Sequence, residues 1–250
     1  MKILSWNVNG LRAVYKRDFL SWFAKTGADI VTLQEIKLQQ DQIPAELVTP
    51  SGYHAFYNFA TKPGYSGVVV YSKMRPQSVG TKLGHARFDS EGRFLDLRYS
   101  TFQLIALYLP HGGRMKENLP YKLDVYKKLL TYLKTHGTDK MILIGDFNIA
   151  HNDIDLARPN QNRDNIMFTL EERKQIDKLV ALGLTDTFRA FHKDGGHYTW
   201  WPYMANTRAR NIGGRIDYAF TSPTMTKKLT DALILPDVPG SDHCPVGVEL

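Results

Sequence analysis

The stretch Lys140-Met-Ile-Leu-Ile-Gly-Asp-Phe-Asn148 is a short apolar run that ends in a carboxylate and an amide. Continuous apolar runs of this length are typical of strands covered on both faces. A carboxylate that closes such a strand lies at the rim of a sheet, held rigidly and within reach of solvent. In extended chain, Asp146 and Asn148 share one face while Phe147 turns inward. The stretch therefore predicts a buried sheet that presents polar groups at its rim.

Other segments repeat this arrangement. Lys2–Asn9 alternates, with Asn7 and Asn9 on one face, and Asp29–Glu35 is a second apolar run closed by a carboxylate. Further strands are predicted by β-rich composition at Gly67–Ser72, Arg93–Arg98, Phe102–Leu109, Ile216–Thr221 and Val246–Leu250.

Helical patterns alternate with these strands. They cover Asp18–Lys25, Lys122–His136 and a segment from Thr169 through Val180, which opens on the capping box Thr169-Leu-Glu-Glu172. In Lys122–His136 the expected apolar stripe comprises Leu123, Tyr126, Leu130 and Leu133. The pattern alone favours an α/β or an α+β fold, with packed sheets covered by helices.

Composition limits the classes of protein. The 250 residues are 43% hydrophobic and carry no repeat or linker, so we expect a single domain over residues 1–250. The net charge of +7 and the pI near 9.3 favour an anionic partner, without separating nucleic acid from a membrane surface or a small phosphate ester.

The single cysteine and the start of the chain bear on location. Cys244 excludes an internal disulfide, fits a reducing compartment, and is expected to be a packed small side chain rather than a nucleophile. No apolar run approaches the roughly 18–20 residues that span a bilayer, and Asn7 interrupts any leader sequence. We expect a cytoplasmic protein, nucleoid-associated in a prokaryote, with no membrane partner. A monomer is expected because no exposed apolar helix face stands out.

Several polar residues could form one site. Asn7, Glu35, Asp146, Asn148 and Asp217 stand at or near strand ends and offer the oxygens and amides that a hard divalent cation and a phosphate need. Each one alone is more typical of an ordinary turn or cap, because Asp and Asn favour both. The hypothesis of a site depends on whether they converge.

A histidine near the C-terminus adds to this set. In Gly240-Ser-Asp-His-Cys-Pro245, Asp242 and His243 are neighbours whose side chains point to opposite faces of extended chain. A remote carboxylate such as Asp217 is a better partner for His243, since it would fix the tautomer and favour imidazolium. Charged His243 could then stabilise a phosphodiester transition state. Tyr108 fits either a core tyrosine or one with a wet hydroxyl.

Basic residues cluster at turns. They are Arg12, Lys16 and Arg17; Arg114 and Lys116; Arg158 and Arg163; and Arg208, Arg210 and Arg215 after Tyr198-Thr-Trp-Trp-Pro-Tyr203. Aromatics followed by arginines suit stacking on nucleotides and contacts to phosphates. A Trp-rich core corner beside a solvated basic loop is the alternative interpretation.

Eight segments occur in the order of a known family. They are SWNVNGLRA (5–13), LQE (33–35), GYSGV (64–68), EGR (91–93), YLP (108–110), GDFNIAH (145–151), RNIGGRIDY (210–218) and GSDHCP (240–245). The chain resembles the exonuclease III family of apurinic/apyrimidinic (AP) endonucleases, within the endonuclease/exonuclease/phosphatase superfamily. The resemblance implies a four-layer α/β sandwich, with two mixed β-sheets packed face to face and helices outside.

The resemblance also implies roles. Glu35 would be the principal Mg²⁺ ligand, with Asn7 and Asp242 nearby and Mn²⁺ as a substitute; one metal suffices, and a second stays open. Asp146 would orient or deprotonate the attacking water, Asn148 would hold a phosphate oxygen, Asp217 and His243 would pair, and Tyr108 would contact the scissile phosphate. The candidate DNA contacts are Arg12, Lys37, Tyr65, Arg93, Arg114, Asn162, Asn165, Trp200, Arg210 and Ile216.

Three residues depart from the family pattern. Gly214 replaces a pocket tryptophan, Met167 stands where many relatives have a small residue, and His111 replaces an amide residue. We hypothesise that Met167 partly fills space vacated at Gly214, which bears on AP-site incision more than on 3′-end trimming. Simple packing by an adaptable methionine competes with this hypothesis.

The function implied is an Mg²⁺-dependent phosphodiesterase on double-stranded DNA. It would cleave 5′ to an abasic site, remove nucleotides or blocking groups from 3′ ends, or both. One alternative is a superfamily phosphoesterase that acts mainly on 3′ ends, or on RNA, inositol phosphate or lipid. Another is an inactive DNA-binding relative, against which the complete polar set argues.

Overall fold

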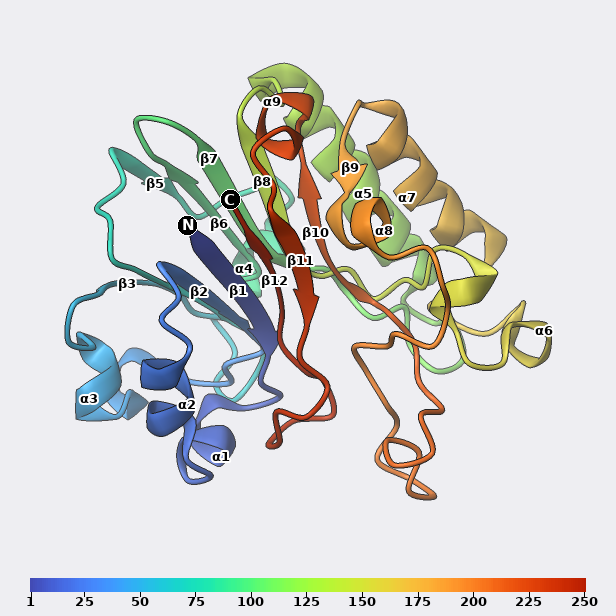
Figure 1. Cartoon of the computed structure of the whole chain (residues 1–250), viewed down its shortest axis with the longest axis horizontal. Coiled ribbons are helices and arrows are strands. Elements are labelled where there is room, and N and C mark those ends of the chain that lie inside the picture. Colours follow the sequence, from blue (N-terminus) through green and yellow to red (C-terminus); the bar gives the residue numbers. More distant parts are fainter.

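Two mixed six-stranded sheets form the centre of the fold in the computed structural model, which describes residues 1–250 (Figure 1). The first has the order β11-β12-β1-β2-β4-β3 and the second β5-β6-β7-β8-β10-β9. The strands are β1 Lys2–Asn7, β2 Ile30–Gln34, β3 His54–Asn58, β4 Val68–Ser72, β5 Ser78–Gly80, β6 Phe94–Arg98, β7 Gln103–Tyr108, β8 Met141–Asp146, β9 Thr185–Asp186, β10 Asp217–Thr221, β11 Asp231–Ile234 and β12 Val246–Glu249. The predicted four-layer α/β sandwich is confirmed.

Helices cover the outer face of each sheet. Their bounds are α1 Leu11–Tyr15, α2 Phe19–Lys25, α3 Ala45–Val48, α4 Ala86–Ser90, α5 Leu119–His136, α6 Pro159–Asn162, α7 Leu170–Ala181, α8 Thr187–Phe191 and α9 Pro223–Thr226, with 3₁₀ turns η1 Gln40–Gln42 and η2 Asp153–Asp155. Helices α1 and α2 lie against the first sheet, and α5 and α7 lie against the second (Figure 1). None of the helices has the length and apolar character needed to cross a membrane.

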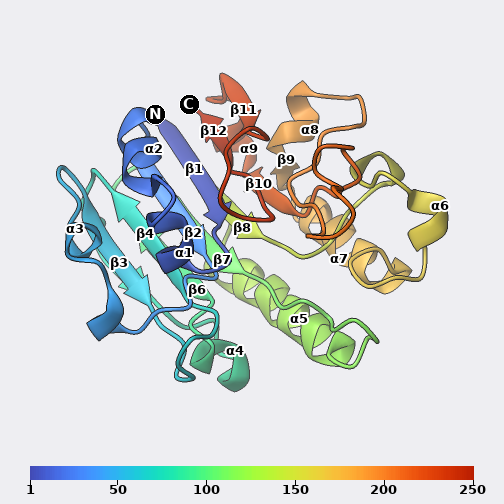
Figure 2. The ribbon, with the colours of Figure 1, turned by 90° about the horizontal axis from the view of Figure 1, so that it is seen from below.

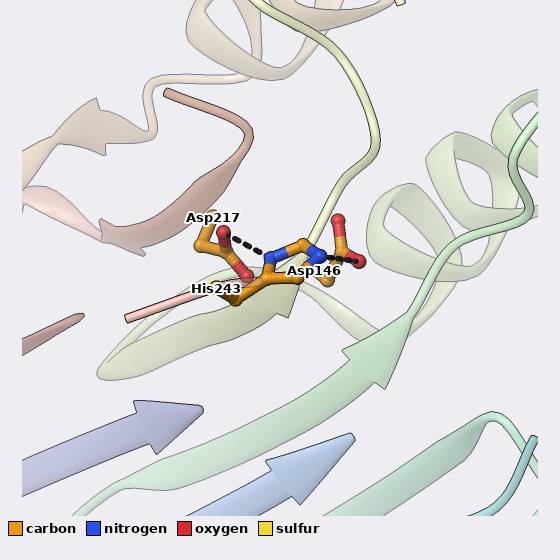
Figure 3. A group of neighbouring side chains, drawn as sticks. All are labelled: Asp146, Asp217 and His243. Carbon is orange, nitrogen blue, oxygen red and sulfur yellow. Dashed lines mark hydrogen bonds and ion pairs between the residues drawn. The ribbon is translucent and has the colours of Figure 1, made fainter. Parts of the chain in front are cut away.

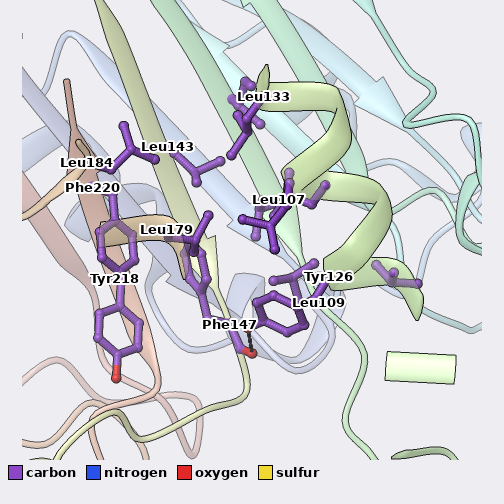
Figure 4. Close-up of a cluster of buried hydrophobic side chains, with 14 of the residues drawn as sticks. Leu107, Leu109, Tyr126, Leu133, Leu143, Phe147, Leu179, Leu184, Tyr218 and Phe220 are labelled. Atoms are coloured by element: carbon purple, nitrogen blue, oxygen red, sulfur yellow. Dashed lines mark hydrogen bonds between the residues drawn. The ribbon is translucent and has the colours of Figure 1, made fainter. Parts of the chain in front are cut away.

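Three apolar layers hold the sandwich together. Between the sheets, Ile3 and Val70 of the first pack with Leu95 and Ile142 of the second. A second layer joins the first sheet to α1 and α2, and a third joins the second sheet to α5 and α7 (Figure 4). Because the central strands are covered on both faces, their sequences are continuous apolar runs rather than alternating ones.

The pairing of the central strands places the polar ends together. Strand β1 runs parallel to β2, and β7 runs parallel to β8, so the carboxyl ends of each pair meet at the same edge. Tyr108 is opposite Asp146 across β7 and β8, and Asp217 is opposite Asp146 across the antiparallel β8–β10 pair. The two chain ends also lie side by side at the opposite edge (Figures 1 and 2).

The predicted elements differ from the structure in a few places. Helix α5 begins at Leu119, and its buried stripe includes Lys122 while Leu123 is only half-buried. Strands β3, β5, β9 and β11 were not predicted, because they are the edge strands of the two sheets and lack a long continuous apolar run. The capping box of α7 is confirmed, since Thr169 Oγ1 accepts from the amide of Glu172 and Glu172 accepts from the amide of Thr169.

Gly145 of β8 gives a test of this packing. Its φ is +147°, and a Cβ there would lie 1.9 Å from the carbonyl oxygen of Leu107 in β7. We expect Gly145→Ala to lower the free energy of unfolding by about 2–4 kcal/mol, measured by urea denaturation. Gly80→Ala is the control, because its Cβ would make ordinary contact with Asp96 at an exposed edge. Equal stability of the two variants would contradict this account of the β7–β8 contact.

Candidate active site

Asp146, His243 and Asp217 form a row of hydrogen-bonded or nearby polar groups (Figure 3). Nδ1 of His243 lies 2.9 Å from Oδ2 of Asp217, and Nε2 lies 3.9 Å from Oδ2 of Asp146. Asp146 closes β8, Asp217 opens β10 beside it, and His243 comes from the segment that precedes β12. All three are at most 5% exposed. The imidazole therefore lies between two buried carboxylates.

The charges of these groups depend on one another. Burial alone would lower the pKa of His243, but the carboxylates of Asp217, Asp146 and Asp242 together outweigh it and raise the value to about 10. Burial, followed by the charge of Asp217, raises the pKa of Asp146 to about 7. At neutral pH the row therefore contains an imidazolium beside a carboxylate that can take up a proton near physiological pH.

Asn7 joins this row to a second acidic group. Its Nδ2 donates to Oδ2 of Asp146 at 2.8 Å and to Oε2 of Glu35 at 3.1 Å. Asn7 and Glu35 come from the first sheet and Asp146 from the second, so this amide bridges the two sheets. The other Glu35 oxygen lies 2.9 Å from the ammonium of Lys37. Glu35 is thus held from both sides.

Asp242 is connected to Glu35 through Asn9 and Lys37. Its Oδ1 accepts from Asn9 Nδ2 at 2.9 Å, and its Oδ2 accepts from the indole of Trp200 at 3.2 Å. The amide oxygen of Asn9 accepts in turn from the Lys37 ammonium. Asn9 was not among the predicted site residues, although its place on the same strand face as Asn7 was a signal for it.

Two sets of groups could hold a metal. The ligand atoms of Asp146, Asp217 and His243 lie within 4.8 Å of one another, but a protonated His243 has no lone pair to offer. Glu35 has a half-buried carboxylate and already attracts a cation, the Lys37 ammonium, so its chemistry fits a hard divalent ion better. Asn7 turns its Nδ2 toward Glu35 and its oxygen toward the Asn9 amide, so in this arrangement it orients the Glu35 carboxylate.

A left-handed turn brings Asn148 to Asp146. Asn148 has φ of 54°, so the extended geometry expected after β8 is wrong. Its backbone amide donates to Oδ1 of Asp146 at 2.8 Å, and its side-chain amide donates to Leu109 O at 2.8 Å and to Asp146. Phe147 is buried between them, as predicted. Asn9, Glu35, Lys37, Ser66 and Met167 are also left-handed. Several residues at and beside the site therefore have backbone conformations that cost energy for a residue other than glycine.

Arg93 supports two tyrosines at the edge of the site. Its guanidinium lies 4.2 Å from the ring centre of Tyr108, donates to Tyr108 O at 3.3 Å and donates to the Tyr65 hydroxyl at 3.1 Å. Its Nε is bound to Glu91. Arg93 is only 3% exposed, so the expectation that it contacts DNA is corrected: it positions Tyr65 and Tyr108 from within.

The other candidate DNA contacts separate into a cavity and a rim. Arg114, Asn162, Asn165, Trp200 and Ile216 line one cavity of about 710 Å³. Arg12 and Arg210 are exposed outside the cavity, while Lys37 and Tyr65 are half-buried beside Glu35 and Arg93. Arg215, which was grouped with the basic turn, is buried and paired with Asp155 and Asp186. It is a structural residue.

The cavity also contains the departures from the family pattern. A Cβ at Gly214 would lie 3.1 Å from Cδ1 of Leu156, and Met167 is not among its nearest neighbours. Leu156 therefore occupies the space expected for Met167, because Leu156 and Gly214 form an antiparallel bridge. Met167 lines the same cavity and packs with Phe168 and Ile216. Both Leu156 and Met167 narrow this apolar pocket. His111 is exposed and accepts from the amide of Gly113.

The link between His243 and Asp217 can be tested directly. In metal-free buffer, Asp217→Asn should lower the pKa of His243 from about 10, because the largest of the carboxylate contributions that oppose burial is then removed. The measurement is an NMR titration of the His243 imidazole. Asp139→Asn, an exposed site, is the control and should leave this pKa unchanged. An unchanged pKa in Asp217→Asn would contradict the assigned pair.

Comparison with known proteins agrees with this geometry. Residues 4–243 match the Endonuclease/Exonuclease/phosphatase family. The exodeoxyribonuclease of Bacillus subtilis is 42% identical and covers 98% of both chains. A structure of a Neisseria 3′ phosphatase bound to a product DNA hairpin superposes with a TM-score of 0.91 at 32% identity, covering 100% of this chain and 98% of that one.

A second solved structure has the same likeness. The AP endonuclease of Archaeoglobus fulgidus superposes with a TM-score of 0.91 at 26% identity, again covering 100% of this chain and 98% of that one. The similarity therefore runs through the whole chain and includes every strand that carries a candidate site residue. The chain belongs to the endonuclease/exonuclease/phosphatase family, and within it this hydrolase is a DNA-repair nuclease.

Proposed function

We propose that the protein is an Mg²⁺-dependent phosphodiesterase that acts on double-stranded DNA at abasic sites and at 3′ ends. The observation that carries this proposal is the imidazolium of His243, which faces the Asp146 carboxylate across 3.9 Å at the strand ends. A cation and a base so placed suit an in-line attack on a phosphodiester. A monomeric, cytoplasmic enzyme in one domain is part of the proposal.

The residues divide the chemistry between them. Asp146, with its pKa raised to about 7, accepts a proton from the attacking water. Charged His243 stabilises the negative charge that develops on the phosphate, and Asp217 keeps it protonated and oriented. The side-chain amide of Asn148 lies beside Asp146 and can donate to a phosphate oxygen. The Tyr108 hydroxyl contributes a further donor, because the ring is held by Arg93.

Glu35 would hold the metal, with Asp242 as a further oxygen ligand and Asn7 orienting the Glu35 carboxylate. When bound there, Mg²⁺ supplies Lewis-acid neutralisation of the scissile phosphate. The Lys37 ammonium, 2.9 Å from Glu35, holds the Glu35 carboxylate in place and would add positive charge near the phosphate. Binding of Mg²⁺ or Mn²⁺ can be followed by calorimetry, independently of turnover, with Glu35→Gln as the variant that weakens it.

The surface around the site suits a duplex. Arg12, Arg114 and Arg210 are exposed, Arg114 lines the cavity, and the whole chain carries a net charge of +7. Phosphate contacts of this kind give binding that weakens as salt rises. Asn162, Asn165 and Trp200 would contact the DNA strand at the cavity, which Ile216 also lines. Tyr65 would contact DNA beside Arg93.

A preference for 3′ ends is the second candidate function. Leu156 and Met167 both narrow the pocket that a flipped-out abasic sugar would enter. A 3′ terminal nucleotide does not need the same depth of pocket. On this basis the balance between the two activities is set at the pocket wall rather than at Asp146 or His243.

Loss of either central group should strongly reduce cleavage. We expect Asp146→Asn and His243→Ala to reduce turnover by roughly 10²–10⁴-fold with Mg²⁺ on two duplexes, one with an internal abasic analogue and one with a recessed 3′ end. Duplex binding should largely survive. Asp139→Asn and His136→Ala, both exposed, are the matched controls. Retained turnover in the two active-site variants would remove this mechanism.

The pocket wall can be varied separately. Met167 has φ of 74°, a conformation that favours glycine, so Met167→Gly should fold well. We expect it to raise incision of the abasic duplex relative to 3′ resection. Leu156→Ala, which opens the space beside Gly214, distinguishes the two wall residues. If the ratio does not change in Met167→Gly, Met167 packs in the wall without gating the pocket.

A further inference from the structure

An ion pair lies completely buried between α5 and α7, the two long helices that cover the second sheet. Lys122 of α5 and Glu172 of α7 are both 0% exposed, and the ammonium contacts Oε1 of the carboxylate. A buried pair of this kind is often no more stabilising than apolar side chains of similar size. Since the pair need not add stability, its role is better sought in the other hydrogen bonds that Lys122 and Glu172 make.

Lys122 holds the loop that carries Asn148. Its ammonium donates to the backbone carbonyl of Asn148 at 2.6 Å. Asn148 is left-handed, and its two amides contact Asp146. Without Lys122 the carbonyl would be buried without this donor, and the strained turn would lose the contact that fixes it.

Glu172 holds the pocket wall in the same way. Its Oε1 accepts from the backbone amide of Met167 at 3.1 Å, and its Oε2 accepts from both the amide and the hydroxyl of Thr169. Met167 is also left-handed, with φ of 74°. The Met167 carbonyl in turn accepts from the amide of Ala150, two residues beyond Asn148.

The pair thus connects two strained turns with different tasks. One presents the amide beside Asp146, and the other forms the wall of the apolar cavity. We propose that the Lys122–Glu172 pair is a positioning device that couples these turns, and so sets both the rate of hydrolysis and the choice between abasic and 3′-end substrates. This inference rests on the proposed function for its kinetic part. Neither residue touches substrate.

Kinetics on the two duplexes test the proposal. The variants are Lys122→Met/Glu172→Leu, which removes both charges together, Lys122→Met, and Lys122→Arg, which keeps a donor. The double variant should remain folded by urea denaturation, yet lose about a hundredfold in kcat with a smaller change in KM, and its ratio of abasic incision to 3′ resection should shift. Lys122→Arg should recover most of the lost kcat.

A second measurement does not depend on activity. Amide hydrogen exchange should accelerate at Met167 in Lys122→Met, although Lys122 makes no direct contact with Met167. If the wild-type protein cleaves neither duplex while this exchange still accelerates, the proposed function fails and the coupling stands. A folded double variant with wild-type kcat and substrate ratio would overturn the positioning role, as would unchanged exchange at Met167.

Discussion

The apolar contact between the two sheets is the constraint on which the rest of the structure depends. It fixes the parallel pairs β1–β2 and β7–β8 against each other, so that their carboxyl ends open at one rim. Asn7 from one sheet can then reach Asp146 of the other at 2.8 Å. Neither strand pair could create this site alone, because Glu35 follows a strand of the first sheet and Asp146 ends a strand of the second. The apolar layer offsets the cost of gathering these charged groups in one place.

Electrostatic balance at the rim follows from this convergence. Glu35, Asp146, Asp217 and Asp242 bring like charges close together, and only two cations, Lys37 and the His243 imidazolium, lie directly among them. The excess of negative charge raises the pKa of His243 and, together with burial, the pKa of Asp146. It also makes the region suited to a divalent cation. The same arrangement thus suits the base, the imidazolium and the cation site of the proposed mechanism.

The sequence revealed the groups at the ends of apolar runs better than those inside helices. Glu35 and Asp146 were predictable because each closes a buried strand, and the motif order predicted the fold. Lys122 was not, since a lysine in a helix is ordinarily exposed and only the fold shows Glu172 beside it. Arg93 was expected to contact DNA near the site, but its side chain is buried. Its burial depends on Tyr65 and Tyr108, which lie 28 and 15 residues away in sequence.

The apolar layers cannot fix the orientation of the turns that carry Asn148 and Met167. Hydrophobic packing is nondirectional, and it would tolerate small rotations of the turns at Asn148 and Met167. Both turns are left-handed, so they relax unless hydrogen bonds hold them. Buried ion pairs supply these bonds at two places, Lys122–Glu172 for the turns and Arg215 with Asp155 for the segment leading into β10. In our proposal, helices α5 and α7 therefore do more than cover the second sheet, because their Lys122 and Glu172 hold the two turns at its rim.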